Sequence, residues 1–278
     1  MNYRHTYHAG NFADVFKHII LVALTQSLTQ KETGFCYLDT HAGIGQYDLL
    51  TGPAQKNKEF KNGILKVLTQ PKPPTLVQSY LECVQAMNPG TSDTLHYYPG
   101  SPAIVRHFLR PQDRMVLCEL HEDDWESLKN NFHHDKQIAV HHQDGYQGLK
   151  AFLPPKERRG FVLIDPPYEK PDEATTAVAG LCMALERWET GTYALWYPIK
   201  ERRSIERFHR TLTQKISHPV LIVELSIYPD NVATHLNGNG IAIVNPPWQL
   251  EQTIKEALGW LWRALSPDQQ GRYDIKML

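Results

Sequence analysis

Short apolar runs of strand length recur along the chain and predict a central sheet. Each run is apolar throughout instead of alternating with polar residues, as expected for strands that are buried on two faces. Stretches of helical length and period lie between most of these runs, and this order predicts an α/β fold with a parallel sheet covered by helices on both faces. The seven predicted strands are Phe35–Leu38, Met115–Cys118, Ile138–Val140, Phe161–Ile164, Tyr193–Trp196, Val220–Leu225 and Ile241–Val244.

Three segments add to this alternation or interrupt it. Residues 11–28 carry apolar positions at helical spacing and predict a helix that packs on the sheet,. The segment from about 50 to 99 contains two helix-like stretches, Phe60–Leu68 and Leu76–Met87, separated by a proline-rich stretch, and we expect a helical insertion there,. Pro229–Gly240 has no periodicity and predicts a loop between the last two strands,.

Length and composition indicate a soluble globular protein. The chain has 278 residues, of which 41% are hydrophobic and 21% charged, and a chain of this length buries roughly 70 to 75% of its extended surface around a core. Its 29 basic and 30 acidic residues give a net charge of -1, so it lacks the overall positive field that many nucleic-acid-binding proteins use. A polyanionic partner would therefore need a local basic patch.

No segment predicts a membrane span or a secretory signal. The longest unbroken apolar run, Ile19–Leu24, is far shorter than the roughly 20 residues of a bilayer-spanning helix,. The first residues lack the apolar segment and the cleavage site of a signal peptide,. We therefore expect a cytoplasmic protein with no membrane partner.

The cysteines and the paired histidines do not predict a metal site. The cysteines stand singly, without the spacing of a disulfide framework or a zinc site, and are typical of small core residues. Two histidine pairs flank a short predicted strand, but no cysteine or carboxylate stands at a matching ligand spacing. We expect no metal. The residues concerned are Cys36, Cys83, Cys118, Cys182, His133-His134 and His141-His142.

A glycine-rich turn follows the first predicted strand. Residues 39–45 read Asp-Thr-His-Ala-Gly-Ile-Gly, and such a turn lets the backbone approach an adenosine-containing ligand closely,. The dinucleotide fingerprint needs a third glycine where Asp48 stands, so a nicotinamide cofactor is disfavoured,. An acidic residue before the glycines suits S-adenosylmethionine better. Taken alone, the motif also fits a turn that only closes a βα unit.

Acidic residues follow the next two predicted strands. In nucleotide-binding α/β sheets, an acid at the end of the second strand holds the ribose hydroxyls, and Glu119 stands there,. Its long separation from the glycine turn is explained if the helical insertion lies between the first two strands. Asp144, before Gly145, is placed to accept a hydrogen bond from an adenine amino group. Singly, each acid fits a solvated strand end equally well, but their shared position at carboxyl ends of adjacent strands favours ligand binding.

The fourth predicted strand ends in Asp165-Pro166-Pro167-Tyr168, the most informative motif in the chain. Two prolines fix φ and remove two backbone donors, which leaves the Pro166 carbonyl exposed beside the Asp165 carboxylate. These two acceptors suit both hydrogens of one exocyclic amine, and the Tyr168 ring offers a face on which a base can stack. We predict that Asp165, Pro166 and Tyr168 position an amine for methyl transfer and that Asp165 accepts its proton.

A second copy of this pattern, Asn245-Pro246-Pro247-Trp248, follows the last predicted strand. Asparagine can serve at the first position of such a motif. However, Asp165 lies on the strand next to strand one, where ligands bind in open α/β sheets, whereas the last strand lies away from that point. We therefore expect the catalytic group to be Asp165.

With these residues in view, the chain closely resembles the bacterial ribosomal large subunit methyltransferase J family over nearly its full length. The resemblance implies a Rossmann-like class I S-adenosylmethionine-dependent methyltransferase sheet with an inserted helical subdomain, in one methyltransferase domain over residues 1–278. The motifs that carry it are Tyr3-Arg4-His5, His8-Ala9-Gly10-Asn11, Ala13-Asp14-Val15, Lys17-His18, Asp39-Thr40-His41-Ala42-Gly43, Tyr97-Tyr98-Pro99-Gly100-Ser101-Pro102, Glu119-Leu120-His121, Asp165-Pro166-Pro167-Tyr168 and residues 191–198 (Gly-Thr-Tyr-Ala-Leu-Trp-Tyr-Pro).

The same resemblance implies a function and a set of site residues. Members methylate N6 of an adenosine in 23S ribosomal RNA and use S-adenosylmethionine, and Asp165 matches their proton acceptor. Tyr3 matches their contact with the substrate RNA. This sequence departs from the family at Ile44, where a smaller residue is expected, and between Pro229 and Asn239. The family's cofactor contacts fall on His18, His41, Ser101, Glu119, Asp144 and Gly145.

Several alternatives remain open from the sequence. An Asp-Pro-Pro-Tyr motif would also suit methylation of guanine N2, of DNA adenine N6 or of a glutamine side chain. Family members have been described as needed for using external DNA as a nutrient, so a nucleic-acid-binding protein with a vestigial cofactor pocket is a further alternative. An NAD-linked oxidoreductase is weakened by Asp48. For the favoured reading we expect a monomer whose partner is 23S ribosomal RNA.

Two basic clusters could contact this RNA, although charge runs are usually solvated faces. A predicted helix from Lys200 onward has more basic than acidic residues. The other cluster, Lys156, Arg158 and Arg159, precedes the fourth strand and lies at its amino end, away from the target base.

Overall fold

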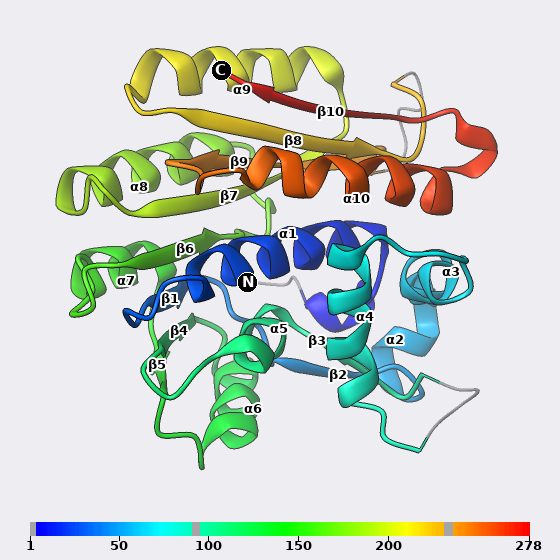
Figure 1. The fold of residues 1–278 in the computed structure, drawn as a ribbon, viewed down its shortest axis with the longest axis horizontal. Helices are drawn as coiled ribbons and strands as arrows, with labels where there is room; N and C mark the ends of the chain where they lie inside the picture. The colour runs from blue at the N-terminus through cyan, green and yellow to red at the C-terminus, as the bar shows by residue number, and fades with distance from the viewer. Residues whose placement is uncertain (1–3, 91–94, 231–235) are drawn as a thin grey trace.

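The computed structural model describes residues 4–90, 95–230 and 236–278. Within these ranges, eight strands form the central sheet, which is stacked from top to bottom in Figure 1. All seven predicted strands are present. In spatial order the strands are β10 (Arg272–Met277), β8 (Val220–Ser226), β9 (Gly238–Val244), β7 (Thr192–Ile199), β6 (Gly160–Ile164), β1 (Cys36–Asp39), β4 (Arg114–Glu119) and β5 (Ile138–His142).

The sheet is mostly but not entirely parallel. β1 pairs in parallel with β4 and β6, and the parallel pairing continues to β5 on one side and β7 on the other. β9 runs antiparallel between β7 and β8, and β10 runs antiparallel to β8. The prediction of a wholly parallel sheet was therefore wrong at this edge. β10 was missed because its sequence mixes charged and apolar residues, as an edge strand with exposed side chains can.

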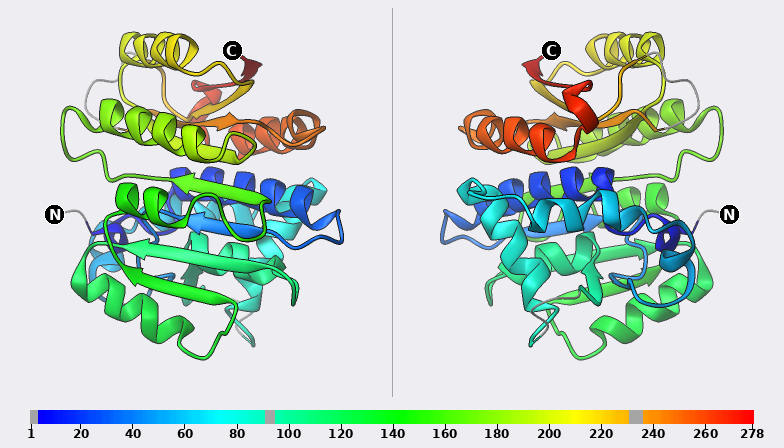
Figure 2. Two further views of the ribbon diagram at one scale, coloured as in Figure 1. Left: turned by 90° about the vertical axis from the view of Figure 1, so that its left-hand side faces the viewer. Right: turned by 90° about the vertical axis from the view of Figure 1, so that its right-hand side faces the viewer.

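Helices cover both faces of the sheet and enclose two apolar clusters. The first cluster involves α1 (Phe12–Thr29), α5 (Ser101–Phe108), α6 (Glu122–Phe132) and α10 (Leu250–Leu265). The second involves α7 (Gly145–Phe152), α8 (Glu173–Arg187) and α9 (Arg202–Lys215). The side views place α9 and α10 on opposite sides of the sheet (Figure 2). A short 3-10 helix, η3 (Pro267–Gln269), joins α10 to β10.

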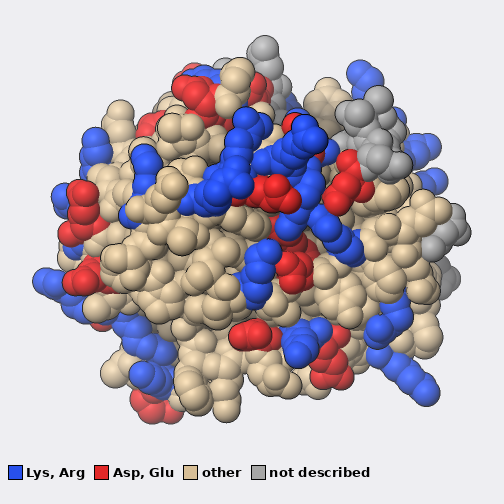
Figure 3. Space-filling view, turned by 90° about the horizontal axis from the view of Figure 1, so that it is seen from above, with Lys and Arg blue, Asp and Glu red and all other residues tan. Residues whose placement is uncertain are grey.

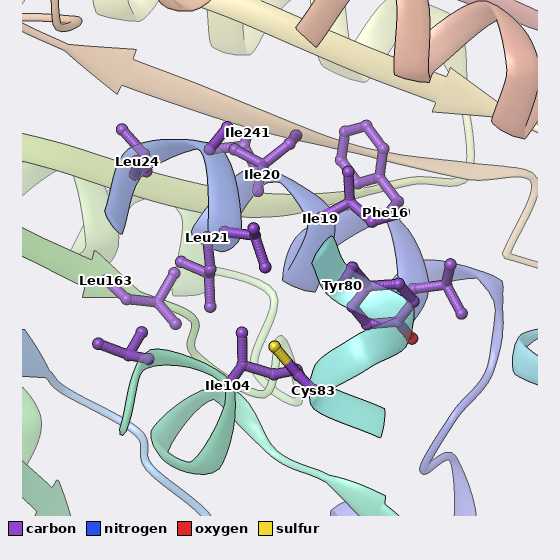
Figure 4. Close-up of a cluster of buried hydrophobic side chains, with 14 of the residues drawn as sticks. Phe16, Ile19, Ile20, Leu21, Leu24, Tyr80, Cys83, Ile104, Leu163 and Ile241 are labelled. Atoms are coloured by element: carbon purple, nitrogen blue, oxygen red, sulfur yellow. The ribbon is translucent and has the colours of Figure 1, made fainter. Parts of the chain in front are cut away.

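α1 is the most deeply buried helix and occupies the range predicted from periodicity. It begins after Asn11, whose side chain accepts hydrogen bonds from the backbone N–H groups of Ala13 and Asp14. Figure 4 shows Phe16, Ile20 and neighbouring side chains of α1 in the apolar cluster between the sheet and the insertion. α1 is long and apolar enough to span a membrane by length and composition, but 83% of it is buried inside the molecule. Core helices pass the same test, so this finding is weak evidence for a membrane span.

The insertion lies between β1 and α5, where the interrupted alternation predicted it. β2 (Gln46–Asp48) and β3 (Tyr97–Pro99) pair antiparallel at its base. Between them lie α2 (Gly52–Asn57), η2 (Glu59–Asn62), α3 (Ile64–Leu68) and α4 (Thr75–Ala86). A 3-10 helix, η1 (His5–Tyr7), precedes α1 and packs on α2.

Two predicted boundaries were wrong. The helix expected over Phe60–Leu68 is broken at Gly63, because a Cβ there would lie 2.1 Å from the backbone oxygen of Gly10, and this close approach bends the chain. The segment expected as a loop over Pro229–Gly240 already enters β9 at Gly238, since glycine and asparagine of that strand pair with β8. Residues 231–235 of that segment lie outside the described residues.

Candidate active site

A cleft of about 600 Å³ opens at the carboxyl ends of β1, β4, β6 and β7. Its wall also includes residues before and within the first turns of α1, and Tyr47, Glu59 and Asn62 of the insertion. Ligand sites in proteins commonly have volumes of this order. Among the residues that line it are Gly43, Glu119, Asp165, Tyr168 and Trp196. The cleft therefore joins the glycine turn to the end of β6.

Glu119 is held in place by the glycine turn itself. Its Oε2 accepts the backbone N–H of Gly43 at 2.8 Å, and its Oε1 accepts that of His121 at 2.9 Å. Gly43 has φ +61, and a Cβ there would lie 2.4 Å from the hydroxyl of Tyr47, so a larger residue would be strained,. Burial raises the pKa of Glu119 in spite of these hydrogen bonds. The carboxylate is thus fixed at one wall of the cleft.

Asp39, the last residue of β1, connects the floor of the cleft to the first residue of α5. Its Oδ2 accepts the hydroxyls of Tyr37 at 2.6 Å and of Ser101 at 2.7 Å, and its Oδ1 accepts the backbone N–H of His41 at 3.2 Å. Burial raises the pKa of Asp39 to about 6, against the lowering effect of these donors. One buried carboxyl group therefore holds two cleft-lining residues, His41 and Ser101.

Two of the histidines that line the cleft, His18 and His41, are held neutral by burial. Burial lowers the pKa of His18 to about 3 and that of His41 to about 4. The Nδ1 atom of His18 shares a hydrogen bond with the hydroxyl of Tyr98 at 2.8 Å, and this hydroxyl lies 3.0 Å from that of Tyr80. The insertion thus fixes the ring of His18 through two buried tyrosines.

An ion-paired lysine to which the sequence analysis gave no role lies against the end of β6. Lys17 Nζ donates to Asp165 Oδ2 at 2.6 Å and lies 3.1 Å from Asp14 Oδ1. Asp14 also pairs with His5 Nε2 at 2.8 Å. Burial alone would raise the pKa of Asp14, but His5 and Lys17 outweigh it and hold the pKa well below its usual value. α1 therefore fixes one oxygen of the Asp165 carboxylate.

Tyr168 stands two prolines beyond Asp165 and faces Trp196 of β7. Its hydroxyl donates to the backbone oxygen of Trp196 at 2.8 Å, and the two rings meet edge to face with centroids 5.7 Å apart. Tyr168 has φ 51, a left-handed conformation that is uncommon for a residue other than glycine,. The unusual backbone and the hydrogen bond together hold the ring at the cleft.

The second motif lies in a different part of the molecule. Val244, at the end of β9, pairs with Tyr193, near the start of β7. Because β9 is antiparallel to β7, Asn245 lies at the amino ends of the parallel strands, opposite the cleft. Asn245 Nδ2 donates to the backbone oxygens of Glu189 and Gly191, both at 2.8 Å. Trp248 is 89% exposed. This end of β9 has no part in the cleft.

Comparison with known proteins places the chain in a family. Residues 32–278 match the family model described as "Ribosomal RNA large subunit methyltransferase D, RlmJ". The chain is 41% identical over 278 residues to a protein from Haemophilus influenzae named Ribosomal RNA large subunit methyltransferase J, with 100% of this chain and 99% of the relative covered. A protein of the same name from Escherichia coli is 40% identical over the same extents. The chain belongs to the RlmJ family. This confirms the family resemblance read from the sequence.

Solved structures agree with this placement. A crystal structure of a protein from Legionella pneumophila covers 97% of this chain and 98% of its own, with 37% identity and a TM-score of 0.88. A probable spermidine synthase from Corynebacterium glutamicum shares the fold alone, at 10% identity and a TM-score of 0.50, over 98% of this chain and 83% of its own. The mostly parallel sheet agrees with the Rossmann-like methyltransferase sheet that was predicted for this family.

As a member of the RlmJ family, the chain is a methyltransferase of large-subunit ribosomal RNA with S-adenosyl-L-methionine as its cofactor. The cleft fits this group. Glu119 is a fixed carboxylate suited to ribose hydroxyls, and Gly43 permits close approach of the backbone,. Among the described residues, no group of three or more histidine, cysteine, aspartate or glutamate side chains could hold a metal ion.

The structure brings most of the predicted site residues of the RlmJ family together. Seven of them line the one cleft, whereas Asp144 and Gly145 stand beside it. Asp144 caps α7 by accepting the backbone N–H of Gln147, and a Cβ on Gly145 would lie 2.2 Å from the oxygen of Thr40, directly under the glycine turn. Tyr3 lies outside the described residues. The seven are His18, His41, Ser101, Glu119, Asp165, Pro166 and Tyr168.

Sequence reasoning named Asp39 only as the acidic residue before the glycines, and it assigned no role to Lys17, Asp14 or Tyr98. One signal was available for Lys17: a lysine and an aspartate three residues apart stand on a helix just before its apolar run, Ile19–Leu24. Such a pair in a buried helix needs partners, because an unpaired buried charge is costly. No comparable signal marked Tyr98, whose hydrogen bond to His18 joins residues 80 positions apart.

Proposed function

We propose that the chain methylates N6 of an adenosine in 23S ribosomal RNA and that Asp165, Pro166 and Tyr168 carry the chemistry. The observation that supports this most directly is the position of the Asp165 side chain. It lines the same cleft as Glu119 and Gly43, beside β1, at the edge where ligands bind in this class of sheet,. An Asp165 turned away from that cleft would have contradicted the proposal.

The residues at the end of β6 act by positioning. The cofactor, when bound, supplies a methyl group on a positively charged sulfur. The Asp165 carboxylate and the Pro166 carbonyl accept the two hydrogens of the amine, which directs the nitrogen lone pair towards that methyl group. A nitrogen–carbon bond forms as the carbon–sulfur bond breaks, and Asp165 accepts the proton that the methylated amine loses. Lys17 keeps the carboxylate in place throughout.

We assign the opposite wall of the cleft to the cofactor. Glu119 accepts the ribose hydroxyls, while His18, His41 and Ser101 contact other parts of the molecule. Asp144 and Gly145, next to the glycine turn, accept the adenine amino group and allow its close approach. The fixed hydrogen bonds of Asp39, Tyr98 and Gly43 prepare this wall before a ligand arrives. Little rearrangement is then needed on binding.

The target base must leave its stack to reach the cleft, because a paired amine inside a helix is out of reach of the methyl group. We propose that it stacks on the Tyr168 ring, and that Tyr3, near the N-terminus, contacts the RNA beside it. We further propose that residues 1–278 act as one methyltransferase domain, as a monomer, in the cytoplasm.

Mass spectrometry of digested RNA tests the assigned product. Unmodified 23S ribosomal RNA is incubated with the enzyme and isotopically labelled S-adenosylmethionine, and the nucleosides are then analysed. We expect label in N6-methyladenosine. Label in N2-methylguanosine, or transfer to DNA adenine in a parallel reaction, would replace the proposed substrate while leaving the methyltransferase assignment intact.

A further inference from the structure

α9 carries a line of arginines on its exposed face. Its buried face packs on the sheet through Ile205, His209 and Leu212. Arg203, Arg207 and Arg210 are all exposed and stand four and three residues apart, a spacing that places them on one side of a helix,. We call these three residues the arginine stripe. It is about 10 Å long at the rise of an α-helix.

The helix that carries the stripe is anchored by its remaining arginine. Arg202 Nη1 donates to Glu224 Oε2 at 2.6 Å, and Glu224 Oε1 accepts the hydroxyl of Tyr197 at 2.9 Å. His209 Nε2 lies 3.2 Å from the same carboxylate oxygen. Burial would raise the pKa of Glu224, but His209 and Arg202 lower it to about 2. The charge of Arg202 is therefore used inside the protein, and it fixes α9 against β8.

Helix stability does not explain the position of the stripe. The N-terminal end of a helix is its positive end, so cations in the first turn are unfavourable. α9 begins with Arg202 and Arg203 and has no acidic residue in its first turn. Glu201 stands at the N-cap but makes no capping hydrogen bond and instead accepts the hydroxyl of Ser204. A bound polyanion would remove this cost.

The face that carries α9 is richer in cations than the molecule as a whole. α9 itself has five arginine and lysine side chains and one acidic side chain, Glu206, whereas the whole chain has a net charge of -1. Figure 3, which views the molecule from the α9 side, shows lysine and arginine side chains gathered on this face with fewer acidic ones between them. This is the local basic patch that a near-neutral protein needs for a polyanion.

The arginine stripe is close in sequence to a residue that lines the active-site cleft. Lys200 lines the cleft and stands two residues before α9, just after the end of β7. β7 is the neighbour of β6, whose end carries Asp165. α9 therefore starts at the same end of the parallel strands as the cleft. Along the chain, Arg203 is the residue of the stripe that stands nearest to Lys200.

We propose that Lys200 and the arginine stripe bind the phosphate backbone of the ribosomal RNA next to the target nucleotide. Arginine suits this role because its planar guanidinium can make two hydrogen bonds to one phosphate. Such contacts position the RNA without reading its sequence. The inference rests on the proposed function, because it assumes that the target adenosine enters the cleft that Lys200 lines.

The test is the salt dependence of RNA binding by the triple variant R203Q/R207Q/R210Q. In vitro transcribed 23S ribosomal RNA is titrated at several salt concentrations. Each lost phosphate contact should reduce the slope of log affinity against log salt by about 0.7 to 0.9, so we expect a reduction of about 2 to 3 and an affinity loss on the order of 100-fold at 0.1 M salt. The loss should also appear as a raised KM for RNA, because the three residues contact the substrate outside the cleft.

Two matched variants make the result specific. K136Q/K150Q/K156Q removes the same charge from exposed residues towards the amino edge of the sheet, and its slope should equal that of the wild type. E206Q removes the one acidic side chain of α9 and should strengthen binding. The proposed role of the arginine stripe is contradicted if the triple arginine variant keeps the wild-type slope, or if the lysine variant loses as much slope and affinity. Wild-type enzyme that gives no N6-methyladenosine contradicts the proposed function instead.

Discussion

Two strand ends in this protein have nearly the same sequence and entirely different surroundings. Asp165-Pro166-Pro167-Tyr168 ends β6 in the cleft, where a lysine holds its carboxylate and a hydrogen bond holds its ring. Asn245-Pro246-Pro247-Trp248 ends β9 at the opposite edge, where the Asn245 side chain binds two backbone oxygens and the Trp248 ring is 89% exposed. Both ends even contain a residue with φ 51.

Strand direction explains this difference. β6 runs parallel to β1, so its end joins the glycine turn. β9 runs antiparallel to β7, so its end faces the other way. A short motif therefore indicates a catalytic function only when the direction of its strand is known. The comparison can be tested by altering matched residues at the two ends.

The largest difference is expected from removing the two side chains that begin the motifs. Asp165→Ala should lower turnover by about 100-fold to 10,000-fold, since a positioned proton acceptor contributes that much. Asn245→Ala should leave the turnover per folded molecule within about twofold of the wild-type value, because Asn245 lies outside the cleft,. Transfer of labelled methyl groups to RNA measures both, and calorimetry with S-adenosylmethionine checks that the Asp165 variant still binds the cofactor. A fully active Asp165 variant would remove the proposed mechanism.

The aromatic residues that end the motifs provide the next test. Tyr168→Ala should lose base stacking of about 1 to 3 kcal/mol, which raises the KM for RNA by about 5-fold to 150-fold at that conversion. Tyr168→Phe keeps the ring and should retain most of the affinity. Trp248→Ala serves as the control and should not change the KM. Equal effects of the two alanine variants would mean that the rings do not differ in function.

Acid should lower the stability of the folded protein through His18. Its pKa is lowered by burial to about 3, so the unfolded chain binds a proton that the folded chain does not, and stability falls as pH decreases below about 6.5. Between pH 7 and pH 5 this costs about 2 kcal/mol. His18→Gln should remove that part of the loss, as followed by urea unfolding at each pH. Equal acid sensitivity in both proteins would contradict the burial of a neutral ring.

Asp39 should act in the opposite direction. Its pKa is raised to about 6, so its stabilising contribution is complete below about pH 4 and is lost as pH rises through 6,. The profile of the wild type therefore combines two opposing slopes. The His18 variant should expose the slope of Asp39.

The last expected effect is on stability alone and belongs to the second motif. Asn245→Ala removes two hydrogen bonds to backbone oxygens and places alanine at φ 51. We expect a loss of about 1 to 3 kcal/mol in the free energy of unfolding, seen as a lower melting temperature. Asn245→Gly should lose less of the free energy of unfolding, because glycine adopts this positive φ without strain. A stable alanine variant with reduced turnover would instead assign this end a catalytic role.

Much of the fold could be predicted because the buried strands are short apolar runs. The same reasoning missed β10, whose charged side chains resemble a loop, and the break at Gly63, which depends on the backbone of a residue distant in the chain. The direction of β9 was also missed. Hydrophobic patterning reports burial, and burial is the same for parallel and antiparallel strands.

The candidate site was predicted in part. Asp165, Glu119 and Gly43 could be found because each follows a strand, and strand ends meet at one edge,. Lys17 and Tyr98 come from a helix and from the insertion, and their contacts with the cleft depend on tertiary packing that short-range patterns do not contain. Sequence motifs located the reacting groups, and the structure was needed to find the residues that hold them.

The central place of α1 has a consequence for how the molecule is made. This helix is among the first segments to be synthesised, yet it packs on β9 and α10, which are among the last. Its apolar side chains therefore lack their packing partners during most of translation, and exposed apolar side chains favour aggregation. We expect the nascent chain to depend on chaperones until residues near 265 have emerged.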